Sequence, residues 1–172
     1  RLENAYNRSD DLVVRFAFFF FFYKDKGVDW LISVFDKTEL NAELHLFGKG
    51  ELTKKSEEII SKNEKIYDHG FLKEDDLLKE LENIDVIVAP SLWDEPFGRV
   101  ILDGYKNACP VIITNRGGMP EVVDDKKTGV ILENETDQGL TDALLFMNKR
   151  ENIRKMLPFI KEKLGDYTVQ EQ

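Results

Sequence analysis

The sequence predicts an α/β fold, a doubly wound, mostly parallel Rossmann-like sheet with helices on both faces. Three observations lead to this prediction. Short apolar segments alternate with segments of helical periodicity through most of the chain. Strands with one face in solvent alternate apolar and polar residues, and these apolar segments do not. They are therefore typical of strands buried on both faces of a sheet. Glycine and proline mark many of the junctions, where they favour turns.

The length of 172 residues fits one compact domain, so residues 1–172 are taken as a single unit. The first residue is Arg1 rather than methionine, and we therefore expect the sequence to start inside a longer protein. No serine- or proline-rich linker and no internal repeat divides the chain.

The expected strands follow the apolar segments. The longest of these, residues 12–22, is expected to be the first central strand. Its phenylalanine block is too short to span a membrane, because a spanning helix needs about 20 apolar residues and Arg15 and Lys24 flank the block. The other expected strands are residues 43–47, 65–68, 85–89, 110–114 and 128–132.

The expected helices fill the intervals. After Gly27, apolar residues recur at helical spacing at Val28, Leu31, Ile32 and Phe35. Further helices are expected at residues 52–62, 75–82, 98–108, 137–148 and 151–164, with a short one starting at Pro120. The polar tail after residue 164 is expected to be loose.

Composition excludes several classes of protein. The chain has 24 Lys and Arg against 33 Asp and Glu, a net charge of −9, and such a surface repels nucleic-acid phosphates. Cys109 is the only cysteine, so an internal disulfide is impossible and a reducing cytoplasm is expected. No paired His or Cys spacing suggests a metal site, and His45 and His69 are interpreted as ordinary strand and loop residues.

The turn after the strand at residues 85–89 holds the residues most suited to chemistry, because ligands of such sheets bind beyond the carboxyl ends of the strands. Gly98 allows close approach of a ligand to the backbone. The N–H groups of Gly98, Arg99 and Val100 at a helix start favour a diphosphate. Arg99 itself approaches a phosphate, or else faces solvent or pairs with an acid, and Trp93 lines a sugar pocket or covers the sheet; the residues leave both choices open.

Two acids bracket this turn. Glu95 lies just before the helix, where its carboxylate can accept hydrogen bonds from hexose hydroxyls. Asp103 lies one and a half turns into the helix from Gly98, where it can reach the paired hydroxyls of a ribose. From the residues alone, simple capping of the turn explains the same composition equally well.

The segment Glu95-Pro-Phe-Gly-Arg-Val-Ile-Leu-Asp103 resembles the E-x7-E element of GT-B glycosyltransferases of family 4, also called glycosyl transferases group 1, with Asp103 in place of the second glutamate. The match covers about residues 12–164, which correspond to the donor-binding C-terminal domain of that family, and the N-terminal acceptor domain is absent from the chain. Further elements resemble the family in order and spacing: residues 26–29, 46–50, 69–72, 110–112 and 117–123.

The resemblance implies a retaining glycosyltransferase that transfers a hexose from a nucleotide-diphosphate sugar to a glycan or lipid-linked acceptor, without a metal or other cofactor. The catalytic positions would be Glu95, which contacts the donor sugar, and Lys26, which clamps the diphosphate. The other matching positions would bind the nucleotide: Gly48, Phe71, Leu72, Phe97, Gly98, Arg99, Val100 and Asp103. The expected location is cytoplasmic, with peripheral membrane association through the missing domain left open.

The sequence departs from the family at the diphosphate clamp. Phe21 stands where the family has an arginine, and Phe20 stands where a glycine precedes it. A contact to the leaving diphosphate would therefore be missing. This motivates an alternative, a sugar-nucleotide-binding module with weak or lost turnover, and the isolated domain is expected to be inactive without its N-terminal domain. A flavodoxin-like binding domain ranks last, because residues 23–27 contain a single glycine.

Overall fold

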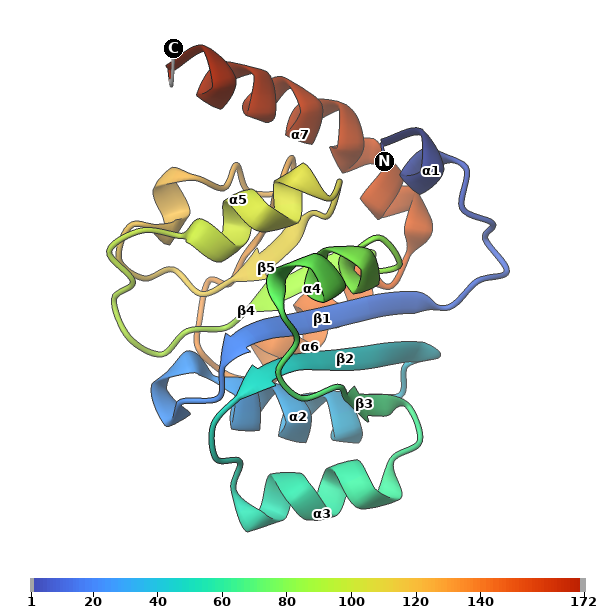
Figure 1. Ribbon diagram of the computed structural model, residues 1–172, viewed down its shortest axis with the longest axis vertical. Helices are drawn as coiled ribbons and strands as arrows, with labels where there is room; N and C mark the ends of the chain where they lie inside the picture. Colours follow the sequence, from blue (N-terminus) through green and yellow to red (C-terminus); the bar gives the residue numbers. More distant parts are fainter. Residues whose placement is uncertain (1, 171–172) are drawn as a thin grey trace.

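The computed structural model describes residues 2–170 and confirms the predicted fold. Six parallel strands form one sheet in the order β3-β2-β1-β4-β5-β6, and helices cover both faces (Figure 1). The strands lie within one or two residues of the expected segments at nearly every end. Their bounds are β1 Val14–Phe21, β2 Ala42–Lys49, β3 Ile66–Asp68, β4 Val86–Ala89, β5 Val111–Ile113 and β6 Gly129–Ile131.

The helices divide between the two faces of the sheet. α2 contacts α3 and α6 on one face, and α5 contacts α7 on the other, where α4 also lies (Figure 1). The bounds are α1 Leu2–Tyr6, α2 Val28–Lys37, α3 Lys54–Lys62, α4 Glu74–Leu81, α5 Arg99–Lys106, α6 Asp137–Met147 and α7 Arg150–Gln170, with short 3-10 helices η1 Lys24–Lys26 and η2 Met119–Glu121.

The core explains why these segments become central strands. β1 pairs with β2 along its whole length, from Val14 opposite Ala42 to Phe21 opposite Lys49. Phe16 and Leu44 are fully buried, as expected for a parallel sheet covered on both faces. Among residues 2–170, no helix is long and apolar enough to cross a bilayer.

The structure differs from the sequence-based expectations at both ends of the chain. The tail after Leu164, expected to be loose, continues α7 as far as Gln170, because Leu164 and Tyr167 extend the apolar face of that helix onto the core. At the other end, α1 was not predicted. It is too short to show periodicity, and it is stabilised by packing of Leu2 and Tyr6 against the core and by contact with α7.

The chain order creates a switch point at the centre of the sheet. From β1 the chain proceeds outward to β2 and β3, then returns to form β4 on the opposite side of β1. The loops that leave β1 and β4 therefore diverge to opposite faces, and a crevice opens between them at the carboxyl ends of the strands. The residues predicted from the sequence to form the site lie at this crevice.

Candidate functional site

A cavity of about 200 Å³ lies at the carboxyl ends of β1 and β4. Its wall combines the end of β1 with the turn before α5 and the start of that helix. Six of the predicted site residues line it: Lys26, Glu95, Phe97, Gly98, Arg99 and Val100. The structure thus brings both predicted catalytic residues, which are 69 positions apart, into one cavity.

One carboxylate oxygen of Glu95 collects three donors. Its Oε1 lies 2.5 Å from Lys26 Nζ, 2.9 Å from Trp93 Nε1 and 3.2 Å from Ser91 Oγ. The Lys26 and Glu95 side chains are mostly buried, so their ion pair is stronger than one at the surface. Lys26 also lies over the Trp93 ring, 4.9 Å from its centroid. Trp93 does not line the cavity itself but contacts two residues that do, Lys26 and Glu95. Ser91 lines the cavity and is a contact that the sequence gave no reason to select.

Close backbone packing brings Lys26 to Glu95. Gly27, which ends η1, has φ of +80°, and a Cβ there would lie 2.0 Å from the carbonyl oxygen of Pro90. The Leu92 N–H also donates to Asp25 O at 2.7 Å. Only a glycine at position 27 therefore allows the turn after β1 to pack this closely against the backbone of the loop after β4.

Two further glycines, Gly117 and Gly118, pack against the backbone of the Glu95 loop. A Cβ on Gly117, whose φ is +55°, would lie 2.2 Å from Glu95 O, and one on Gly118 would lie 2.6 Å from Pro96 O. The Gly118 N–H donates to Glu95 O at 2.7 Å, and Thr114 Oγ1 donates to Ser91 O at 2.5 Å. The double glycine was noticed in the sequence as part of the resemblance, but its contact with the Glu95 loop depends on the fold.

The start of α5 differs in one respect from the expectation. The Arg99 N–H was predicted to be free for a diphosphate, but it donates to Phe97 O at 3.1 Å. The Ile101 N–H likewise donates to Gly98 O at 3.0 Å. Within residues 2–170, the N–H groups of Gly98 and Val100 have no protein acceptor, so two of the three expected amides remain as donors for an anion.

A second cavity, of about 310 Å³, adjoins the first. The two cavities share Phe19, Phe20 and Arg99 in their walls. Arg99 is exposed, and its side chain is positioned beside both. The remaining predicted binding residues line this second cavity: Gly48, Phe71, Leu72 and Asp103.

Asp103 has an altered electrostatic environment. Partial burial raises the pKa of its carboxyl group, and the positive charges of Lys106 and Arg99 partly offset this effect. Glu74 of α4 lines the same cavity and also acts to raise the Asp103 pKa. The wall of this cavity therefore carries two carboxyl groups, those of Asp103 and Glu74, which would accept hydrogen bonds from hydroxyl groups of a ligand.

The phenylalanine segment was expected to be core, and this is wrong for Phe20. Phe18, Phe19 and Phe22 are buried, whereas Phe20 is 43% exposed on the shared wall of the two cavities. Its φ of +141° is a conformation that favours glycine. Phe21 lines the second cavity and stacks on Tyr23, with ring centroids 5.2 Å apart.

The described residues offer little for other chemistry. Residues 2–170 contain no cluster of three His, Cys, Asp or Glu side chains arranged to hold a metal ion. Cys109 is fully buried, its thiol contacts Ile84 O at 3.2 Å, and burial raises its pKa, so it is an unreactive core residue.

Comparisons with known proteins identify the family and the fold of this chain. Residues 16–159 match the family model of glycosyl transferases group 1. An uncharacterized glycosyltransferase of Methanocaldococcus jannaschii is 32% identical over 138 residues, which are 79% of this chain and 38% of that protein. The chain therefore spans well under half the length of that relative.

Two solved structures share the fold at low identity. The C-terminal domain of a group 1 glycosyl transferase of Francisella tularensis has a TM-score of 0.77 and 20% identity, covering 89% of this chain and 85% of that one. An Anabaena protein solved in complex with UDP has a TM-score of 0.70 and 17% identity, covering 97% and 55%. The fold is that of GT-B glycosyltransferases, and the family match over most of the sequence shows that the chain belongs to the glycosyl transferases group 1 family.

Proposed function

We propose that this chain is the donor-binding half of a retaining glycosyltransferase and binds a nucleotide-diphosphate sugar across both cavities. The observation that carries this proposal is the adjacency of the two cavities at the switch point, with the Lys26–Glu95 pair in one and Asp103 in the other. The nucleoside would occupy the second cavity, with its ribose at Asp103 and its base beside Phe71 and Leu72. The hexose would lie in the first cavity, at Glu95.

The diphosphate would lie between them, at the start of α5. Free amides at Gly98 and Val100 and the Arg99 guanidinium supply positive potential at that point. Lys26 would exchange part of its contact with Glu95 for a diphosphate oxygen. The Anabaena neighbour in complex with UDP supports a uridine nucleotide as the first donor to test.

In the proposed reaction, the bond between the anomeric carbon and the diphosphate oxygen breaks while an acceptor hydroxyl forms a bond to the same face of that carbon. The hydroxyl proton passes to the departing diphosphate. Lys26 and the α5 amides would stabilise the negative charge that develops on the leaving group. Glu95, already held by three donors, would orient the sugar hydroxyls rather than attack the sugar. This scheme uses no metal ion.

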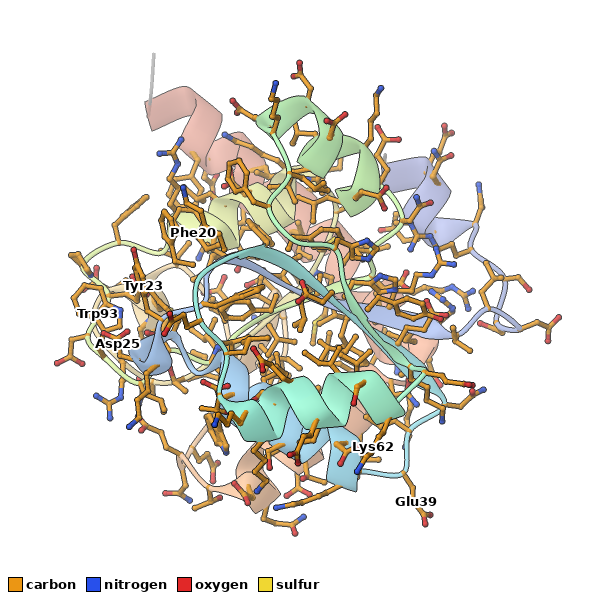
Figure 2. All side chains as sticks on the ribbon, turned by 60° about the horizontal axis from the view of Figure 1, so that its bottom comes forward. Phe20, Tyr23, Asp25, Glu39, Lys62 and Trp93 are labelled. Carbon is orange, nitrogen blue, oxygen red and sulfur yellow. The ribbon has the colours of Figure 1, made fainter. Side chains whose placement is uncertain are left out.

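The acceptor and the remaining domain are also proposals. Exposed aromatic side chains gather around the cavities: Tyr23, Phe71, Trp93 and Phe97. Figure 2 shows Phe20, Tyr23 and Trp93 at one end of the molecule, whereas Glu39 and Lys62 lie at the other. Such an apolar rim suits a surface that another domain covers. We propose that an N-terminal domain docks there and presents a glycan or lipid-linked acceptor, in a cytoplasmic protein with optional membrane contact.

A second candidate is a sugar-nucleotide-binding module without turnover. Phe20 and Phe21 favour it, because the Phe20 ring stands on the wall shared by the two cavities, at the level of the proposed diphosphate, and Phe21 lines the second cavity. In this case the domain would still bind nucleotide sugars, but the full-length protein would not transfer them.

Calorimetric titration with UDP-, GDP- and ADP-glucose tests both candidates. We expect one of these to bind, and Lys26→Ala and Glu95→Ala to weaken its binding about tenfold or more. Lys24→Ala, in the same short helix, is the matched control and should bind normally. Absence of binding by the unaltered domain would contradict the proposal, and turnover by the full-length protein separates the two candidates.

A further inference from the structure

Four rings with nearly parallel planes form a row on one face of β2 and β3. Residues alternate between faces along a strand, so Glu43, His45 and Phe47 of β2 share a face, and Tyr67 of β3 is directly paired with His45. Neighbouring centroids lie 4.7 Å apart for Tyr67 and His45, 5.1 Å for His45 and His69, and 4.5 Å for His69 and Phe47. The angles between these ring planes are 7°, 13° and 9°.

Hydrogen bonds fix the direction of proton donation in this row. His45 Nε2 lies 2.9 Å from Glu43 Oε1, and His45 Nδ1 lies 2.8 Å from His69 Nε2. A carboxylate only accepts, so His45 must donate from Nε2. In a neutral His45 the other nitrogen then carries no proton, and it must accept the hydrogen bond that His69 donates.

The row ends at the wall of the second cavity. His69 is the residue from which the chain leaves β3 for Gly70, Phe71 and Leu72, and the last two line that cavity together with Phe47. Backbone hydrogen bonds attach this segment to β2, from His69 N–H to Leu46 O and from Gly48 N–H to Gly70 O, both 2.9 Å. The side chain of His69 is therefore the point at which His45 can influence the loop.

We propose that His45 is a positioning residue, which holds the loop of residues 69–72 through His69 and thereby sets the shape of the nucleoside cavity. The identity of the ligand rests on the function proposed above, whereas the positioning of the loop does not. Glu43 fixes the tautomer of His45, because it accepts the hydrogen bond that Nε2 donates and leaves Nδ1 free to accept the hydrogen bond from His69.

The hydrogen bond between His45 and His69 depends on the protonation states of both imidazoles. It persists with both imidazoles neutral, and also with His45 protonated, because Nδ1 can then donate to an unprotonated His69 Nε2. When both imidazoles are protonated, two N–H groups face each other and the contact is lost. Burial lowers the pKa of His45, although its hydrogen bond to Glu43 opposes this shift.

The other charged or titratable groups around the pair come from three elements. Arg15 of β1 contacts Glu43 at 3.2 Å, and its charge disfavours protonation of His45. Tyr67 of β3 flanks His45, and Glu74 of α4 lines the cavity at the far end of the row. We therefore expect the loop to be held at neutral pH and released on acidification, once both imidazoles are protonated.

Amide hydrogen exchange in the unliganded domain tests the positioning directly. His45→Phe keeps a ring in the row but removes the acceptor, whereas His45→Asn keeps an acceptor oxygen close to the position of Nδ1. We expect His45→Phe to lower the protection factors of the Gly48 and Gly70 amides about fivefold, and His45→Asn to retain most of the protection. Tyr67→Phe, which keeps all four rings, is the control and should match the unaltered domain.

Titration with UDP-, GDP- and ADP-glucose between about pH 5 and pH 8 tests the consequence for binding. These donors carry no phosphate group that titrates in this range. The unaltered domain should lose affinity on acidification, while His45→Phe should bind about fivefold more weakly at pH 8 with a flatter pH profile. Protection factors and a pH profile of His45→Phe equal to those of the unaltered domain would overturn the proposal. If no donor binds at any pH, the proposed function fails, and the protection factors still decide the role of His45.

Discussion

The two halves of the site are built differently. On the β4 side, the loop that carries Glu95 is fixed by backbone contacts with Pro90, Gly117 and Gly118, and its side chain has three donors. On the β1 side, Phe20 adopts a backbone conformation that favours glycine and exposes its ring to both cavities. The half proposed to bind the sugar is therefore preorganised, whereas the wall proposed to face the diphosphate carries backbone strain at Phe20 and receives no cation from the end of β1.

The contact that joins the two halves should have the largest effect on stability. Gly27→Ala would place a Cβ 2.0 Å from Pro90 O at a φ of +80°, so either η1 or the loop after β4 must move. We expect a loss of about 3 kcal/mol in the free energy of unfolding, measured by urea denaturation. Gly165→Ala in α7, where a Cβ meets no atom within 4 Å, is the control and should be neutral or stabilising. An equal, small effect of both changes would contradict the close packing.

The preorganised half should dominate binding. Glu95→Gln keeps the size of the side chain but removes its charge, so Lys26 loses its ion pair. We expect about a tenfold loss of donor affinity, and a smaller loss for Trp93→Phe, which removes one of the three donors to Glu95. Calorimetry at neutral pH measures both. If Trp93→Phe had the greater effect, Trp93 would contact the ligand itself rather than hold Glu95.

Relief of the backbone strain at Phe20 tests the β1 side of the site. Phe20→Gly suits the φ of +141° and removes the ring from the shared wall, so we expect about 1 kcal/mol of added stability and tighter nucleotide binding. Phe20→Ala also removes the ring but retains the unfavourable backbone. Its stability should not increase. Equal stabilities of the two variants, measured by thermal and urea unfolding, would show that Phe20 carries no backbone strain.

The smallest effect should be that of Asp103. Because burial raises its pKa in the folded state, the folded protein binds more protons than the unfolded chain between the two pKa values, and stability falls as pH rises through that interval. Asp103→Asn should remove this fall, and unfolding curves between about pH 3 and pH 7 would measure it. An unchanged pH dependence would mean that Asp103 is better solvated than its half-buried position indicates.

Sequence reasoning predicted much of the fold because the strands are apolar runs bounded by glycine and proline, a local signal. It also selected Glu95 and Asp103, since acids and a glycine at a strand-to-helix turn are recognisable along the chain, whereas Lys26 was selected only through the resemblance to the family. The hydrogen bond from Arg99 N–H to Phe97 O was not predictable, because it depends on the angle at which the loop enters α5. The roles of Ser91 and the His45–His69 pair depend on residues that only the folded sheet brings together.

The same limit applies to the phenylalanine segment. Burial on both faces of β1 follows from its composition, but the exposure of Phe20 follows from its place where the strand ends at the edge of both cavities. The α1 helix and the end of α7 were missed for a related reason, because each is held by packing against the other parts of the fold.

A crystal of this domain soaked with UDP-glucose, or with whichever sugar nucleotide binds in the titrations, tests the central claim most directly. We expect the diphosphate at the Gly98 and Val100 amides, with the hexose hydroxyls at Glu95 and the nucleoside between Phe71 and Asp103. A ligand bound elsewhere, or confined to one cavity with the start of α5 empty, would contradict it.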